Sequence, residues 1–201
     1  MGSFWDFCAP FYDLAEKMNG CAYGNMLKTI QELVPDGSTV LEIAAGTGSV
    51  SLAVANKAAD ILCTDISEKM LAVAKKKAKK RGIENIKFDN LNIFDTKKPD
   101  NFFDVVIASQ ILHLIDNPEK AAFELRRITK SMTVIPMSLT KNLRGTAKFN
   151  LAVYRLFGFS PKIEFEADSY SDFLKNIGFT DCKMIQIAGK IPMAVAIWKK
   201  Q

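Results

Sequence analysis

The sequence predicts an α/β protein built on a doubly wound, mostly parallel sheet. Three observations lead to this prediction. Short apolar runs rich in β-branched residues alternate with segments of helical periodicity along most of the 201 residues. A glycine-rich turn follows the first of these runs and opens a helix. A short turn separates the last two runs, which predicts a closing antiparallel hairpin.

The apolar runs are the predicted strands of a seven-stranded sheet. Runs of this kind, bounded by turn residues, are typical of strands buried between two layers of helices. In chain order they are 39–43, 59–65, 86–93, 102–109, 132–137, 179–187 and 191–198. One sheet of this size suits a single domain of this length.

The helices predicted around the sheet have recognisable ends. Ser67 is a favourable N-cap, Gly82 suits a helix end, and Pro118 is favoured in the first turn of a helix. The predicted helices are 21–34, 50–57, 67–82, one beginning near 117–119, and 170–177. The aromatic-rich start of the chain, residues 4–18, adds a helical N-terminal extension.

The glycine-rich turn after 39–43 predicts a nucleoside site. A strand, a tight turn and a helix N-terminus bring backbone N–H groups close to a ligand. A dinucleotide fingerprint would need a third glycine where Ser51 stands, and here an acid, Glu42, precedes the turn. Asp65 ends the next strand, roughly 20 residues beyond the glycines, at the spacing where a carboxylate meets ribose hydroxyls. Asp65 by itself fits an NAD site as well.

Glu42 followed by Gly46-x-Gly48 resembles the first motif of the class I S-adenosylmethionine (SAM) methyltransferases. The resemblance, which implies a Rossmann-like fold, runs from about Val34 to the C-terminus. The usual motif is acid-x-Gly-x-Gly-x-Gly, so Ala44 replaces its first glycine. Alanine can replace glycine where φ is negative, and we expect a negative φ here. Glu42, Ala44, Gly46, Gly48 and Asp65 are therefore predicted to bind SAM, which becomes S-adenosylhomocysteine as product.

The same resemblance implies an adenine subsite after the third strand. In the family an acid and a small apolar residue bracket the adenine, and the matching positions are Asn92 and Ile93. The amide oxygen of Asn92 can accept the same hydrogen bond without the charge. A surface role for Asn92 is the competing interpretation, and Asp89 and Asp95 are the alternatives if the register differs.

Four further residues complete the predicted cofactor site. Ile66 directly follows Asp65, and Ser109 ends the fourth predicted strand. The resemblance to small-molecule methyltransferases implies a helical lid over 1–34, with Tyr12 and Tyr23 near the methionine end of SAM or the substrate. Core packing of the same helices is the alternative.

The resemblance also points to a class of substrate. Segment 138–168 stands where the family usually builds a substrate cover, and its aromatic residues, among them Phe157 and Phe159, favour an apolar or aromatic acceptor. Ile111-Leu112-His113 after the fourth strand looks like the small-molecule group, including quinone-type enzymes. The Asn-Pro-Pro-Tyr motif of nucleic-acid amino methyltransferases is missing.

His113, the only histidine, is the candidate catalytic residue. Its ordinary pKa near 6.5 would suit a general base at neutral pH. A place in the pocket wall is the competing interpretation. No cysteine pair or histidine cluster predicts a metal site.

Composition excludes several classes of partner. The net charge of +5 comes largely from lysines at 75–81, which follow the solvated face of a helix without interleaved aromatic residues. We therefore expect no nucleic-acid partner. Scattered cysteines, no signal peptide and no long apolar run predict a cytoplasmic protein without a membrane span. The oligomeric state stays open.

The predicted function is transfer of a methyl group from SAM to a nucleophilic O, N, S or C atom of a small, apolar or aromatic molecule. An NAD-type oxidoreductase and a non-catalytic SAM-binding protein are the alternatives. The sequence does not name the accepting atom.

Overall fold

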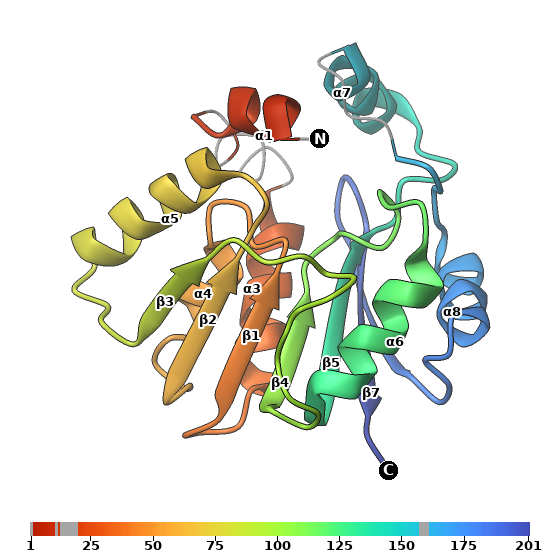
Figure 1. Ribbon diagram of the computed structural model, residues 1–201. Coiled ribbons are helices and arrows are strands. Elements are labelled where there is room, and N and C mark those ends of the chain that lie inside the picture. The colour runs from red at the N-terminus through yellow and green to blue at the C-terminus, as the bar shows by residue number, and fades with distance from the viewer. Residues whose placement is uncertain (1, 11, 13–19, 157–160) are drawn as a thin grey trace.

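The computed structural model describes residues 2–10, 12, 20–156 and 161–201. Phe157 and Phe159 of the predicted substrate cover lie outside the described residues. Within the described part, seven strands form one sheet in the order β3-β2-β1-β4-β5-β7-β6 (Figure 1). The strands are β1 Thr39–Ile43, β2 Asp60–Thr64, β3 Ile86–Asp89, β4 Phe103–Ala108, β5 Thr129–Ser138, β6 Lys183–Ile187 and β7 Met193–Lys199.

The sheet is doubly wound with an antiparallel end, so the predicted fold class is confirmed. β1 pairs in parallel with β2 and β4, while β7 runs antiparallel between β5 and β6. The strand order reverses between β1 and β4, because β2 and β3 extend the sheet to one side and β5 to the other. Ligands of such sheets bind beyond the carboxyl ends of the strands at this reversal.

Three strand boundaries differ from the prediction by three residues or more. The sixth strand begins at Lys183 instead of residue 179, and the other two differences have identifiable reasons. The third strand stops at Asp89 instead of reaching residue 93, because its partner β2 ends at Thr64, the residue that pairs with Asp89. Beyond it, the Asn92 Oδ1 accepts a hydrogen bond from the Phe94 backbone N–H at 2.9 Å. The fifth strand begins at Thr129 instead of residue 132, directly after a helix and with no loop between them. Its Thr129 hydroxyl donates to the Leu125 carbonyl at 2.7 Å, which joins the two elements.

Helices cover both faces of the sheet (Figure 1). Three pack on one face: α3 Cys21–Leu33, α4 Ser49–Val54 and α5 Glu68–Lys80. Two pack on the other: α6 Pro118–Ile128 and α8 Ala167–Asn176. The remaining helices, α1 Gly2–Cys8 and α7 Gly145–Leu156, stand above the carboxyl ends of the strands (Figure 1).

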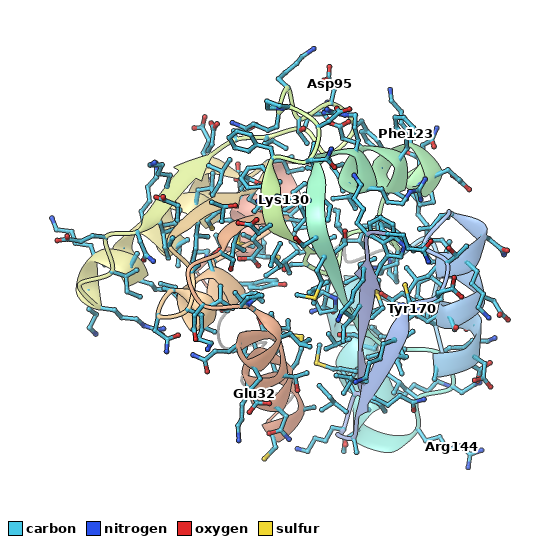
Figure 2. The ribbon with its side chains drawn as sticks, turned by 90° about the horizontal axis from the view of Figure 1, so that it is seen from below. Glu32, Asp95, Phe123, Lys130, Arg144 and Tyr170 are labelled. Atoms are coloured by element: carbon cyan, nitrogen blue, oxygen red, sulfur yellow. The ribbon has the colours of Figure 1, made fainter. Side chains whose placement is uncertain are left out.

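Side chains that alternate along each strand supply two separate cores. Val40 and Val105 face the α3–α5 layer, whereas their neighbours Leu41 and Val106 face α6 and α8. Figure 2 shows Tyr170 on α8 beside the sheet, while Glu32 and Phe123 lie on the periphery. Tyr170 is fully buried and its hydroxyl donates to the Ile135 carbonyl at 2.9 Å. Both faces are therefore closed, and the carboxyl edge is left for a ligand.

The predicted lid over 1–34 divides into parts with different surroundings. Ala22, Met26 and Ile30 of α3 are buried against the sheet, so this helix belongs to the core layer. α1 lies instead above the carboxyl edge, where the Ser67 hydroxyl donates to the Asp6 carboxylate at 2.5 Å. Residues 13–19 lie outside the described part of the chain.

Gly48 sets the distance between the glycine turn and α5. Its φ is +74°, and a Cβ added there would lie 2.9 Å from the Ala74 Cβ. Gly82, at the far end of α5, has a similar φ of +65° but open space around it. An alanine at Gly48 would therefore meet both backbone strain and a steric clash, whereas an alanine at Gly82 would meet backbone strain alone.

Replacing Gly48 by alanine is expected to lower the free energy of unfolding by about 2–4 kcal/mol. About 1 kcal/mol of this comes from the left-handed backbone and the rest from overpacking against Ala74. The control Gly82→Ala meets only the backbone term, about 1 kcal/mol. Urea denaturation of both variants measures the difference, and equal losses would contradict the tight packing of the turn on α5.

Candidate cofactor site

The candidate site lies where the carboxyl ends of β1, β2 and β4 meet. The glycine turn after β1 is tied to β2 by a hydrogen bond from the Ala45 N–H to the Thr64 carbonyl, 2.9 Å long. The Ser109 N–H ties the end of β4 to the Ile43 carbonyl of β1 at 3.0 Å. Long-range bonds thus bring the predicted motif residues to one edge of the sheet.

Asp65 holds the glycine turn and faces the site. Its Oδ2 accepts from the Gly46 N–H and its Oδ1 from the Ser67 N–H, both at 2.8 Å. Burial raises the pKa of this carboxyl, an effect opposed by these backbone hydrogen bonds and increased by the charge of Asp6. Each carboxylate oxygen keeps a further lone pair, which fits the hydroxyl donors of a ribose.

Ala44 adopts a backbone conformation that the sequence analysis did not expect. Its φ is +56°, in the left-handed region, so the expected negative φ is wrong. The turn that carries the chain from β1 to Gly46 requires this conformation, which a glycine adopts freely. Alanine tolerates it at a cost of about 1–2 kcal/mol.

Glu42 is enclosed by hydrogen bonds of the protein itself. The side chain is only 1% exposed. Its Oε2 accepts from the Ser51 N–H at 2.8 Å and from the Ser51 hydroxyl at 2.5 Å. Its Oε1 accepts from the Ser109 hydroxyl at 2.6 Å. Glu42 and Ser109 therefore join the first turn of α4 to the end of β4, and they shape the site from beneath.

The predicted adenine side of the site is formed by the loops after β2 and β3. The Asn90 amide donates to the Ile66 carbonyl at 3.0 Å and holds these loops together. Ile66 leaves 47% of its surface exposed, while Ile93 is buried in the core that faces α6 and α8. Ile66 thus offers the apolar surface that suits an adenine ring. The Asn92 side chain is exposed, with its oxygen already accepting from Phe94.

The two predicted tyrosines occupy different places. The Tyr12 ring lies over the glycine turn, with its Cε1 3.5 Å from the position that a Cβ would take at Gly46. The edge of Trp5 packs against it, at 6.3 Å between ring centroids. Tyr23 packs from α3 against the core on that face of the sheet. Of the two predicted tyrosines, Tyr12 is therefore the one that lies at the glycine turn.

A family profile described as a methyltransferase domain matches residues 35–184. The chain belongs to this family. The resemblance to class I SAM methyltransferases is thereby confirmed, and SAM rather than NAD is the cofactor that the acid, the glycine turn and Asp65 fit.

Curated relatives of this chain include enzymes named for quinone biosynthesis. Ubiquinone/menaquinone biosynthesis C-methyltransferase UbiE of Paraburkholderia phytofirmans is 35% identical over 137 residues, which cover 64% of this chain and 55% of that protein. Demethylmenaquinone methyltransferase of Clavibacter sepedonicus is 34% identical over 94 residues, covering 47% and 38%. The chain spans about half or less of the length of these curated relatives.

Solved structures with the same fold carry different activities in their names. The [4+2]-cyclase SpnF has a TM-score of 0.77 and 16% identity, covering 99% of this chain and 94% of its own. A SAM-dependent methyltransferase of Thermotoga maritima, described as a possible histamine N-methyltransferase, has a TM-score of 0.75 and 16% identity over the full length of both chains. At these identities the likeness concerns the fold alone.

His113, five residues beyond the end of β4, is buried. Only 7% of the residue is exposed, and burial lowers its pKa to about 4. Its carbonyl accepts from the Lys162 N–H at 2.9 Å, which joins the loop after β4 to the segment that follows α7. Neutral at physiological pH, this imidazole is a weak base, so its burial speaks against the general-base role.

In and beside the candidate site the structure contains features that the sequence analysis missed. The Asp6–Ser67 hydrogen bond and the 2.5 Å bond between the Ser138 hydroxyl and the Gln110 Oε1 both join segments distant in the chain. No local pattern signals either pair. In the described part of the chain, no cluster of histidine, cysteine or acidic residues could hold a metal ion. Likewise, none of its helices is long and apolar enough to cross a bilayer.

The burial of His113 predicts a loss of stability in mild acid. The unfolded chain takes up a proton near pH 6.5, whereas the folded protein does so only near pH 4. Stability should therefore fall as the pH decreases between these values, by about 3 kcal/mol. Asp104 and Glu124, whose pKa values are lowered to about 2, lose their contributions mainly at lower pH.

Denaturation of the wild type and of His113→Gln at several pH values tests this. The variant should lack the loss of stability between pH 6.5 and 4, and the same pH dependence in both proteins would show that His113 is not buried as described.

Proposed function

We propose that this protein transfers the methyl group of SAM to a nucleophilic O, N, S or C atom of a small apolar or aromatic molecule. The observation that carries the proposal is Asp65, held at the end of β2 by the Gly46 and Ser67 N–H groups with Ile66 exposed beside it. This arrangement suits a ribose and an adenine in one subsite. The names of the curated relatives support a quinone-like ring as the acceptor.

The chain contributes mainly by orienting the reactants. When bound, SAM supplies a sulfonium methyl, whose bond to sulfur breaks as the acceptor's electron pair bonds to the methyl carbon. The residues at the edge of the sheet hold the acceptor in line with that bond. A phenol or amine acceptor also releases a proton, and the weak basicity of buried His113 favours release to solvent over transfer to this residue.

Two segments are proposed to cover the site. α1 is fastened above the edge by the Asp6–Ser67 bond, and Tyr12 lies on the glycine turn. On the other side, the Lys141 N–H donates to the Phe165 carbonyl at 3.0 Å, which closes the segment containing α7 into a loop above β5. We assign 138–168 to the acceptor and α1 with Tyr12 to the cofactor.

The proposal extends to partners and location. A small-molecule acceptor, rather than nucleic acid, suits a site enclosed by these segments. The exposed lysines of α5 follow a helix whose other face is buried, as expected for a solvated surface. The four cysteines are unbonded, which agrees with a cytoplasmic location.

Removing the Asp65 carboxylate should weaken cofactor binding. Asp65→Ala is expected to bind S-adenosylhomocysteine about 100-fold less tightly, because the ribose hydroxyls lose charge-assisted hydrogen bonds. The control is Asp60→Ala, at the opposite end of the same strand and exposed. Isothermal titration calorimetry measures both affinities, and an unchanged affinity in Asp65→Ala would remove Asp65 from the site.

Transfer of radiolabelled methyl from SAM into a fractionated cell extract tests the reaction itself. The expected result is label in the small-molecule or lipid fraction, dependent on the protein. Label confined to protein or RNA would refute the acceptor class. Cofactor binding without any transfer would favour a non-catalytic SAM-binding protein, since the same fold also occurs in a protein named a cyclase.

A further inference from the structure

A pair of polar residues stands at the carboxyl ends of β4 and β5, next to the cofactor residues but not among them. Gln110 lies two residues beyond the end of β4, and Ser138 is the last residue of β5. Both are half-buried. The Ser138 hydroxyl donates to the Gln110 Oε1 at 2.5 Å, and the Gln110 N–H donates to the Pro136 carbonyl at 3.3 Å.

The backbone of Gln110 adopts a strained conformation. Its φ is +48°, in the left-handed region. Asparagine and aspartate adopt this conformation readily, and among the described residues only Ala44, Lys97 and Gln110 do so without being one of these or glycine. Ala44 and Gln110 follow adjacent strands on either side of the strand reversal. Strain concentrated at such a place points to a function.

The hydrogen bond from Ser138 determines which end of the Gln110 amide is available. Because the hydroxyl donates to Oε1, the amide is held with its Nε2 pointing away from Ser138. Within the described residues, no hydrogen bond uses the two N–H groups of that nitrogen. A half-buried amide held in this way offers donors to an incoming molecule.

The position of this amide relates it to the methyl acceptor. The ribose and adenine residues follow β1, β2 and β3, so the acceptor must approach from the β4 and β5 side of the reversal. The segment proposed to cover the acceptor, 138–168, begins at Ser138 and contains α7, which stands above this edge (Figure 1). Gln110 therefore lies between the cofactor residues and the acceptor cover.

Building on the proposed function, we propose that Gln110 selects the acceptor by donating a hydrogen bond from Nε2 to an oxygen on its ring, and that Ser138 is the positioning residue that orients this amide. The site thereby prefers phenols, hydroxyquinones and similar oxygen-bearing rings to hydrocarbon rings of the same shape. An ammonium group, which has no lone pair to accept this bond, gains nothing from Gln110.

Two probes of nearly equal shape test the selection. 1-Naphthol carries a hydroxyl group on its ring, whereas 1-methylnaphthalene carries a methyl group at the same position. Their binding to wild-type protein saturated with S-adenosylhomocysteine is measured by fluorescence titration. We expect naphthol to bind at least about tenfold more tightly, and the preference to fall to about twofold or less in Gln110→Met, which keeps the length of the side chain but loses its donors.

The control variant places a methionine at another residue with a left-handed backbone. Lys97→Met also replaces a residue of positive φ, in an exposed loop that follows β3 rather than β4 or β5, and should leave the naphthol preference unchanged. Ser138→Ala should lose most of the preference, and Ser138→Thr should restore it because its hydroxyl can again donate to Oε1.

An unchanged preference in Gln110→Met, or a wild-type protein that does not distinguish the two probes, overturns this inference. Neither result contradicts the proposed function if the protein still binds S-adenosylhomocysteine and still transfers radiolabelled methyl from SAM to a small molecule. Failure of those two measurements refutes the proposed function instead.

Discussion

The buried carboxylate of Glu42 is the interaction on which the site depends. A charge with 1% exposure is tolerated in a protein interior only when hydrogen bonds surround it. Ser51 and Ser109 supply those bonds from α4 and from the end of β4. Because these elements are far apart in the chain, satisfying one carboxylate brings β1, α4 and β4 into a single arrangement. The glycine turn is the part of β1 that this arrangement leaves facing a ligand.

The two strained residues, Ala44 and Gln110, follow from the same arrangement. Each turns the chain sharply at the end of one of the two strands that flank the reversal of strand order. The surrounding hydrogen bonds hold these left-handed conformations against their intrinsic cost. At Ala44 the turn leads to Gly46 and Asp65, and at Gln110 it places an amide beside Ser138. The candidate cofactor site and the proposed acceptor contact thus depend on neighbouring turns.

The fold itself does not define the reaction. Chains named as a cyclase and as a methyltransferase share it with this protein at 16% identity. What distinguishes such proteins is the set of side chains above the carboxyl edge and the segments that cover it. The segments proposed for that role here are α1, fastened through Asp6, and the loop containing α7. On this proposal the acceptor is chosen by segments outside the common sheet.

The sequence by itself determined the sheet and the family, and it singled out the candidate cofactor residues. Apolar periodicity and the spacing of Glu42, the glycines and Asp65 are local properties of the chain, so they can be recognised in the sequence without the structure. Only the tertiary structure decided that Ala44 is left-handed, that burial makes His113 a weak base, and that Gln110 meets Ser138. These depend on which distant segments pack together, because burial, backbone strain and hydrogen-bond partners are set by neighbours in space rather than in the chain.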